Sequence, residues 1–466
     1  MAFLLNRTLK AVALAGVAAV AAPALANSLP PGQPAHRTKP LPVAEIIHAG
    51  TLLAVPGEAP LTNATLVTAD GKVVSVKKGF LDAVALGLPA DTAVIDLSSK
   101  FVMPGFMDMH VHLTSGGAGR DNPMLKLREP EAYFTMVGYA NGIDTLMAGF
   151  TTVRDLGSPG DTMFALRDAI HDGVVAGPKI VAAGEGISPT NGHADVHGLR
   201  RDLMEAQIRP GVCDGADDCR RAVRDAVKYG ANVIKVHVTG GVLDESDAGT
   251  GQQFTDDELR AIVETGHMMG RKVTTHAHGK EGIDAAVRAG YDSIEHAMWA
   301  DEESLKLMKQ HGTWLVPTVW PISWVGDTPE TVRAGPFRNL PQNSLDKLYK
   351  LGDQPKKMVR LAIRLGVKIA LGTDNGIAPH GTNGQEMLEY VEAGMTPMEA
   401  LKTGTVNASE AGGLPDRGRL TPGMAADVVA LDGNPLEKID AVLDVDFVMR
   451  DGLVFKRDGK PTELVR

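Results

Sequence analysis

Residues 101–112 read Phe-Val-Met-Pro-Gly-Phe-Met-Asp-Met-His-Val-His. An apolar run is broken by Pro-Gly, resumes, and ends in two histidines, His110 and His112. On a β-strand, side chains at positions i and i+2 point to the same face, so both imidazoles would project into one space. Two neighbouring imidazoles suit a metal centre. The segment therefore predicts a strand, Val102–His112, that ends in two candidate metal ligands.

The middle of the chain alternates between short apolar segments and helical patterns. After Val102–His112, the expected strands are Thr151–Leu156, Lys179–Gly184, Asn232–Val238, Lys272–His276, Ser293–His296, Trp314–Thr318 and Lys368–Thr373. This alternation favours an α/β fold, a (β/α)8 TIM barrel. An open doubly wound sheet is the alternative, but it would have a Gly-rich phosphate-binding turn after its first strand, where this chain has two histidines.

Both ends of the chain have a different pattern, with short strands separated by turns. Asp70-Gly71 and Asp451-Gly452 are typical of tight hairpin turns between such strands. We therefore expect one small β-sandwich domain built from both chain ends, residues 27–102 and residues 415–466. The barrel would be formed by residues 103–414.

Several predicted strands contain or end in residues that can bind a metal. Strand four contains Lys235, strands five and six end in His276 and His296, and Asp374 directly follows strand eight. Singly, each also suits a structural role: a lysine can extend to solvent, a histidine can be a hydrogen-bonded core residue, and an aspartate can cap a helix. In a barrel, however, the carboxyl ends of all strands meet at the face where catalytic groups lie. We therefore favour a metal centre at this face.

The first 26 residues have the pattern of a signal peptide. Arg7 and Lys10 precede the apolar segment Ala11–Ala22, and Ala24-Leu25-Ala26 is an A-x-A cleavage site. The apolar segment is too short to span a membrane, so we expect an exported, periplasmic protein with no membrane partner. Loss of the leader changes the net charge from −10 to −12, which, without a Lys/Arg cluster, argues against a nucleic-acid partner.

The chain has two cysteines, Cys213 and Cys219, separated by five residues. In an exported protein, a disulfide that closes this small loop is the expected state. Half of a metal site is the alternative, but no histidine lies near either cysteine in the sequence.

The motifs at the predicted strand ends resemble those of the amidohydrolase superfamily. The matching segments are Pro104-Gly-Phe-Met-Asp-Met-His-Val-His112, Gly149-Phe-Thr-Thr-Val-Arg-Asp-Leu156, Gly230-Ala-Asn-Val-Ile-Lys235, Thr239-Gly-Gly241, His276-Ala-His278, Ile294-Glu-His296, Gly372-Thr-Asp374 and Gly418-Arg-Leu-Thr-Pro-Gly-Met-Ala-Ala-Asp427. The resemblance covers Ile46 to Lys456. It is nearest to the imidazolonepropionase-related branch, with its exported prolidase-like dipeptidases, carboxypeptidases and ochratoxin-hydrolysing amidohydrolases.

This resemblance implies a centre of two divalent metal ions, with zinc as the expected metal. The implied ligands are His110, His112 and Asp374 for one ion, His276 and His296 for the other, and Lys235 as the bridge between them. Lys235 would be carboxylated by carbon dioxide to N6-carboxylysine. The anionic carbamate would also remove the cost of burying a free ammonium.

The resemblance also implies a mechanism. Asp374 would take a proton from the attacking water, whose pKa the ions lower, and pass it to the leaving amine. His278 and His193 are the candidates for stabilising the oxyanion and, with Ser115, for contacting the substrate, although a structural role is the alternative for each. Weaker candidates for the site are His237, His380 and Asn383.

The substrate is less well specified by the sequence. Trp314, Trp320 and Trp324 would form an apolar wall for a bulky substrate, or else pack in the core. A carboxypeptidase also needs a cation for the substrate carboxylate, for which Arg154 and Arg200 are guesses.

We expect an enzyme that hydrolyses a peptide or amide bond and releases a C-terminal amino acid, as a dipeptidase or carboxypeptidase does. Its substrate would be a small peptide or an N-acyl amino acid, with aromatic amides such as ochratoxin A as further substrates. A cyclic-amide hydrolase or deaminase of the same superfamily is the second hypothesis. A catalytically silent metal-binding protein is the third. We expect an oligomer of identical chains.

Overall fold

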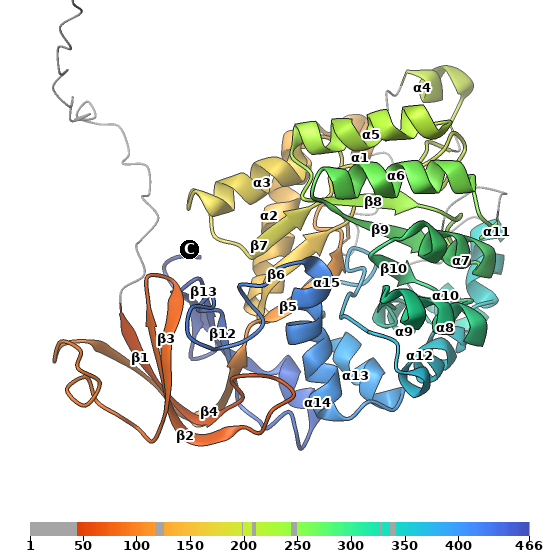
Figure 1. Cartoon of the computed structure of the whole chain (residues 1–466). Helices are drawn as coiled ribbons and strands as arrows, with labels where there is room; N and C mark the ends of the chain where they lie inside the picture. Colours follow the sequence, from red (N-terminus) through yellow and green to blue (C-terminus); the bar gives the residue numbers. More distant parts are fainter. Residues whose placement is uncertain are drawn as a thin grey trace, which may run out of the picture. The chain divides into compact units, whose positions relative to one another are not determined.

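The computed structural model describes residues 44–116, 125–197, 199–206, 211–243, 249–326, 328–335 and 342–465 (Figure 1). The predicted signal peptide, residues 1–26, lies outside these ranges. Within them, no helix combines the length and the apolar character needed to cross a membrane. The fold is of the α/β class, as the sequence predicts, with parallel strands and helices alternating between two β-rich chain ends.

The two chain ends contribute to one sheet. Its strands are β1 Glu45–Leu52, β2 Leu61–Ala69, β3 Lys72–Lys78, β4 Ala93–Pro104, β12 Val428–Leu431, β13 Val445–Arg450, β14 Leu453–Arg457 and β15 Lys460–Pro461. They lie in the order β15-β14-β13-β12-β4-β1-β2-β3. Because the described strands pair into a single eight-stranded sheet, the predicted two-layer sandwich is not confirmed.

Both predicted hairpin turns are confirmed. Asp70 and Gly71 join β2 to β3 with φ angles of 50° and 75°. Asp451 and Gly452 join β13 to β14 with φ angles of 48° and 73°. Two consecutive left-handed residues are what a tight hairpin turn requires, and Asp and Gly tolerate that conformation.

The parallel strands of the middle of the chain lie in two sheets. They are β5 Phe106–Val111, β6 Phe150–Asp155, β7 Lys179–Ala182, β8 Val233–His237, β9 Lys272–Ala277, β10 Ser293–His296 and β11 Trp314–Val316. One sheet has the order β5-β6-β7 and the other the order β11-β10-β9-β8. Single parallel bridges lie outside these ladders: Ile187 with Val236, Leu315 with Ile369, and Val111 with Asn375.

Helices follow most parallel strands (Figure 1). They are α1 Leu125–Arg128, α2 Glu131–Met147, α3 Thr162–His171, α4 Arg201–Glu205, α5 Ala216–Tyr229, α6 Asp256–Met268, α7 Lys280–Ala289, α8 Glu302–His311, α9 Trp320–Val325, α10 Pro329–Ala334, α11 Gln342–Tyr349, α12 Gln354–Leu365, α13 Gln385–Glu392, α14 Pro397–Lys402, the π-helical turn η1 Thr403–Asn407, α15 Ala408–Gly412 and the 3-10 turn η2 Ile439–Leu443. Several end at a left-handed glycine, which stops the helix without steric cost: Gly230, Gly290, Gly312 and Gly366.

The predicted first barrel strand is two strands. β4 ends at Pro104 and β5 begins at Phe106, so the chain leaves the terminal sheet and enters the parallel sheet between them. Gly105 marks the crossing, because a Cβ there would lie 2.4 Å from the hydroxyl oxygen of Thr151. A larger residue at position 105 would clash with Thr151 of β6.

The predicted strand Lys368–Thr373 does not form a regular ladder. Its bridges are single, at Ile369 and at Asn375 just beyond it. The segment still lies beside β5, since the Met109 amide donates to the Leu371 carbonyl at 2.9 Å and the Asp374 amide to the His110 carbonyl at 2.6 Å. Within the segment the Leu371 amide donates to the Thr403 carbonyl at 3.0 Å instead of to a strand, and just beyond it Asp374 has a φ of 56°, outside the β region.

Candidate metal centre

The predicted site residues come together in one cavity of about 820 Å³. The residues that line it include His110, His112, Ser115, His193, Lys235, His276, His278, His296 and Asp374. Of the weaker candidates, His237 also lines the cavity. His380 and Asn383 do not; His380 bonds the Ser115 carbonyl, and Asn383 donates to Asp108. The structure therefore places every predicted ligand and substrate contact around one space, while their roles remain predictions.

Asp374 lies at the centre of the first predicted ligand set. Its Oδ1 is 3.5 Å from Nε2 of His110 and 3.2 Å from Nε2 of His112. His110, His296 and Asp374 each have one potential ligand atom within 4.8 Å of the others, and all three are buried. Buried imidazole and carboxylate donors at such separations can share a metal ion.

The other ring nitrogen of three histidines is held by the protein. Nδ1 of His110 donates to Oε2 of Glu295 at 2.9 Å, and Nδ1 of His112 donates to the Gly157 carbonyl at 3.0 Å. Nδ1 of His296 is 2.7 Å from the hydroxyl of Thr318. A carboxylate or carbonyl partner places the proton on Nδ1 and leaves Nε2 free to bind a metal.

His276 has a ring nitrogen that could bind a metal. Its Nε2 is buried and has no hydrogen-bond partner in the described part of the chain. Its ring stacks on His193 at 4.3 Å between centroids and meets the edges of His278 at 4.5 Å and His296 at 4.6 Å. A buried polar atom without a partner is costly, so this imidazole fits a metal ligand.

Burial keeps most of these imidazoles neutral. It lowers the pKa of His110 to about 4 and the pKa values of His276 and His296 well below the ordinary value. Burial also acts to lower the pKa of His112, but its hydrogen bond to Asp374 and the negative charges of Asp374 and Asp155 together outweigh burial, so this pKa is raised. Neutral imidazole is the form that binds a metal.

Lys235 is buried in β8 with 2 % of its surface exposed. Burial lowers its pKa to about 8, although the carboxylates of Glu295 and Asp374 act in the opposite direction. In the part of the chain that the structure describes, its ammonium has no hydrogen bond or ion pair. The shift favours the neutral amine of Lys235.

The ends of three strands depart from β geometry at the site. His296 has a φ of 70°, Ala297 of 52°, Thr318 of 52° and Asp374 of 56°. Left-handed backbone is uncommon outside glycine, and it concentrates where the surrounding fold imposes it, often at functional sites. This backbone turns His296 and Asp374 toward the cavity.

Neither guessed arginine faces the cavity. Arg154 is 1 % exposed and donates to Oε1 of Glu295 at 2.8 Å, and Arg200 is exposed and pairs with Asp202. The guess that either arginine binds a substrate carboxylate is therefore wrong in this structure. Arg154 is paired with Glu295, and Arg200 lies outside the cavity lining. Sequence reasoning missed Glu295, although a carboxylate inside the apolar strand Ser293–His296 was a visible signal.

The predicted tryptophan wall is also wrong. None of Trp314, Trp320 and Trp324 is among the described residues that line the cavity. Trp314 packs beneath the strands and Trp320 donates to the hydroxyl of Thr382 at 2.9 Å. The apolar lining comes from Phe134, Leu156, Val212, Val242, Leu243, Met298, Pro321, Ile322 and Ile377.

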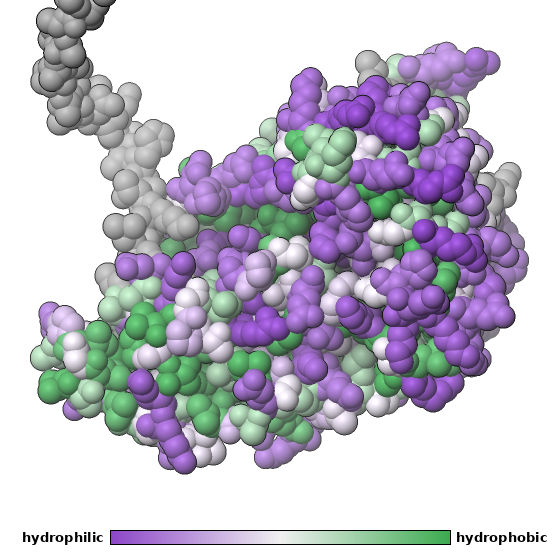
Figure 2. All heavy atoms as spheres, viewed as in Figure 1, coloured by the Kyte–Doolittle hydropathy of each residue, from purple (hydrophilic) through white to green (hydrophobic). Residues whose placement is uncertain are grey.

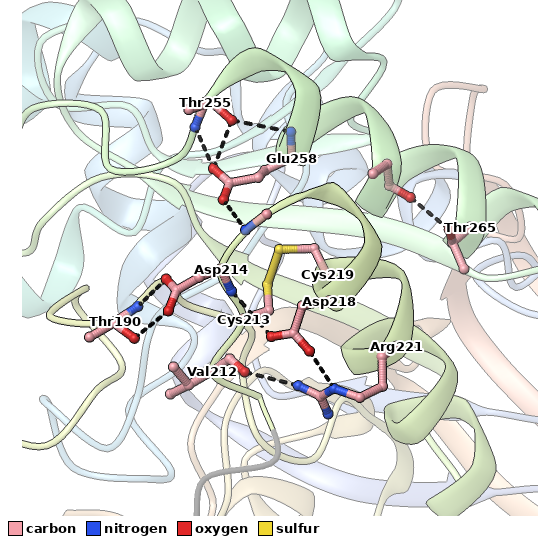
Figure 3. Close-up of a disulfide and its surroundings, with 12 residues drawn as sticks. Thr190, Val212, Cys213, Asp214, Asp218, Cys219, Arg221, Thr255, Glu258 and Thr265 are labelled. Atoms are coloured by element: carbon pink, nitrogen blue, oxygen red, sulfur yellow. Dashed lines mark hydrogen bonds and ion pairs between the residues drawn. A yellow bond between two sulfur atoms is a disulfide. The ribbon is translucent and has the colours of Figure 1, made fainter.

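The predicted disulfide between Cys213 and Cys219 is present (Figure 3). It ties the segment before α5 to that helix. Asp214 accepts the backbone amide of Thr190 at 3.1 Å and its hydroxyl at 2.6 Å. Val212 lines the cavity, and Thr190 begins the loop that leads to His193. The disulfide therefore braces both a wall segment and the His193 loop.

Removal of this disulfide should weaken the protein and the cavity wall together. For the variant Cys213→Ser/Cys219→Ser we expect a loss of about 2 kcal/mol in the free energy of unfolding, the size that the chain-entropy model gives for so short a loop. We also expect a raised KM, because Val212 and the His193 loop lose their brace. Denaturant unfolding and steady-state kinetics, with and without a thiol reductant, measure both. Reductant should change the stability and the KM of the wild type but not those of the variant. An unchanged KM in the variant would contradict the bracing role.

The chain matches proteins of known family over most of its length. Residues 101–454 match the model of the Amidohydrolase family. The chain is 36% identical to ochratoxinase from Aspergillus niger over 434 residues, which is 89% of this chain and 87% of that protein. The solved structure of that ochratoxinase superposes with a TM-score of 0.77 at 34% identity, over 90% of this chain and 96% of the other.

A second solved structure is also similar over most of the chain. It is a Xaa-Pro dipeptidase with methionine bound in its active site, with a TM-score of 0.82 and 36% identity over 89% of this chain and 100% of the other. The family match spans well over half of the chain and includes all the predicted metal ligands. The protein therefore belongs to the amidohydrolase family, the enzymes that hydrolyse C–N bonds.

Proposed function

We propose that this protein uses two metal ions to cleave a peptide or amide bond and to release a C-terminal amino acid. One observation supports this most: imidazoles from separate strands, the buried Lys235 and the carboxylate of Asp374 line a single cavity. Nε2 of His110 and of His112 face Asp374, and Nε2 of His276 has no partner among the described residues. This donor set suits zinc.

The residues would divide into two sets with a bridge. His110, His112 and Asp374 would hold one ion, His276 and His296 the other, and carboxylated Lys235 would link them. A carbamate forms when a neutral amine adds to carbon dioxide and loses a proton, and the lowered pKa of Lys235, about 8, favours the neutral amine. The bridge would turn a buried cation into an anionic oxygen ligand.

The residues of the chain would move the proton and orient the substrate. When bound, the two ions would supply a water of lowered pKa and polarise the scissile carbonyl. Asp374 would accept the proton of the attacking water and donate it to the leaving amine. His278 and His193 would donate to the oxyanion, and Ser115 would contact the substrate. The backbone amide of His278 donates to the Thr239 hydroxyl at 3.0 Å, which fixes the main chain at this residue.

We also propose that residues 103–414 close into a (β/α)8 barrel. Single bridges support this: Ile187, in the segment after β7, pairs with Val236 of β8, Ile369 pairs with Leu315 of β11, and Asn375 pairs with Val111 of β5. We propose further that residues 27–102 and 415–466 form a β-sandwich domain. Side chains from both chain ends share one hydrophobic cluster, which supports this.

The relatives suggest the substrate class. By their names, one acts on Xaa-Pro dipeptides and the other on ochratoxin, and methionine is bound in the active site of the dipeptidase. The cavity of about 820 Å³ and its apolar lining suit a dipeptide or an aromatic N-acyl amino acid. Export to the periplasm is in keeping with the disulfide.

An oligomer of identical chains remains part of the proposal. Large apolar side chains are exposed on and around the N-terminal strands: Val74, Phe80, Val84 and Val94, which are 43% to 74% exposed. Figure 2 shows apolar surface over β1 to β4. Exposed apolar clusters of this kind are typical of surfaces that pair with another chain.

The substrate class can be tested with zinc-loaded protein on dipeptides, N-acyl amino acids and lactams in parallel. We expect free amino acid to be released from the first two groups and no ring opening. A chelator should abolish the activity and added zinc should restore it. Turnover of lactams alone would favour the cyclic-amide hydrolase, and no turnover of any compound would favour a silent metal-binding protein.

A further inference from the structure

A buried ion pair lies beneath the candidate metal centre. Nη2 of Arg154 is 2.8 Å from Oε1 of Glu295, and the two side chains are 1% and 0% exposed. Neither residue lines the cavity. They cannot touch a substrate there, so a role in the reaction would have to act through another residue.

The ion pair joins the two parallel sheets. Arg154 lies on β6, in the sheet β5-β6-β7, and Glu295 lies on β10, in the sheet β11-β10-β9-β8. Arg154 also donates from Nε to the Met109 carbonyl on β5 at 2.6 Å. On the other side, Ser293 donates to Oε1 of Glu295 at 2.8 Å, and the Thr274 hydroxyl also bonds it. Four strands, β5, β6, β9 and β10, thus meet at this ion pair.

Glu295 also reaches the metal ligands. Its second oxygen, Oε2, accepts Nδ1 of His110 at 2.9 Å. His296, which directly follows Glu295, is a predicted ligand of the other ion. One residue therefore contacts a ligand in the first sheet and is adjacent to a ligand in the second.

Stability alone does not explain such a pair. Two buried charges lose their hydration, and well-packed apolar residues of similar size often serve a fold as well or better. Buried polar partners of metal-binding histidines, by contrast, orient the ring and raise its affinity for the metal.

We propose that the Arg154–Glu295 pair sets the position of His110 relative to His276 and His296, and so fixes the spacing of the two ligand sets. Arg154 and Glu295 are positioning residues. This inference rests on the proposed metal centre, because it assigns these residues a task only if ions bind there.

The test compares two charge-balanced double variants by zinc titration of the apo-protein against a competing chelator. Arg154→Met/Glu295→Leu removes the acceptor for His110, and we expect zinc affinity to fall 10- to 100-fold. Arg154→Met/Glu295→Gln keeps an acceptor oxygen but no ion pair, so its affinity should fall by less. Thermal unfolding of the apo-proteins separates a loss of metal binding from a loss of fold.

A second buried pair provides the matched control. Nη1 of Arg417 is 2.6 Å from Oδ2 of Asp427, with exposures of 3% and 4%, and neither lines the cavity. Arg417→Met/Asp427→Asn should lower stability and leave zinc affinity unchanged. If the leucine variant does not fold, the zinc affinity of the glutamine variant is compared with that of this control, and this comparison decides.

Unchanged zinc affinity in the Glu295 variants, or an equal loss in the control, would overturn the inference. If only the glutamine variant kept the wild-type zinc affinity, the ion pair would not be needed, and Arg154 would no longer be part of the inference. A wild-type protein that binds no zinc would instead contradict the proposed metal centre.

Discussion

Asp374→Asn is expected to lower kcat by roughly 10²- to 10⁴-fold, the size typical of a lost general acid–base. The amide cannot accept the proton of the attacking water. The fold should persist, because Asn is close to Asp in size and tolerates the left-handed φ of 56° at this position. Turnover at saturating zinc, with circular dichroism to monitor the fold, measures the effect.

Asp458→Asn is the matched control for this prediction. Asp458 also has a left-handed backbone, with a φ of 50°, but it lies in the exposed turn between β14 and β15. The control should turn over substrate at the wild-type rate. Near-normal kcat in Asp374→Asn would refute the proton-transfer role, and a pH profile of kcat that loses its acidic limb in this variant would support it.

Lys235→Met is expected to reduce bound zinc from two ions per chain to one or none and to abolish most activity. Methionine nearly preserves the side-chain volume but cannot form a carbamate. Because the change also removes a buried ammonium without an ion pair among the described residues, the apo-protein should be at least as stable as the wild type. Elemental analysis of the zinc-loaded protein and thermal unfolding of the apo-protein measure the two effects.

Lys179→Met serves as the control, since Lys179 begins the parallel strand β7 and does not line the cavity. It should retain two ions. If Lys235→Met also retained two ions per chain, the carbamate bridge would have to be abandoned, although a metal centre on the histidines and Asp374 would survive.

The sequence by itself determined which residues meet. Alternation at period two places His110 and His112 on one side of a strand, and parallel strands in sequence bring their carboxyl ends to one face. These rules are local or topological, so they hold before any packing is known. Lys235, His276 and His296 lined the cavity for the same reason. Hairpin turns at Asp70-Gly71 and Asp451-Gly452 were predictable because their backbone preferences are local.

The tertiary structure decided how those residues are held. Glu295 and His110 are 185 residues apart in the sequence, and their hydrogen bond exists because the fold brings strands of two sheets together around a buried arginine. The irregular eighth strand and the left-handed backbone at His296 and Asp374 are likewise imposed by neighbours. The tryptophans do not line the cavity: Trp320 is bonded to the distant Thr382, and Trp314 and Trp324 pack in hydrophobic clusters. Side-chain direction follows from the local chain, whereas partners and strain depend on contacts that only the packed fold creates.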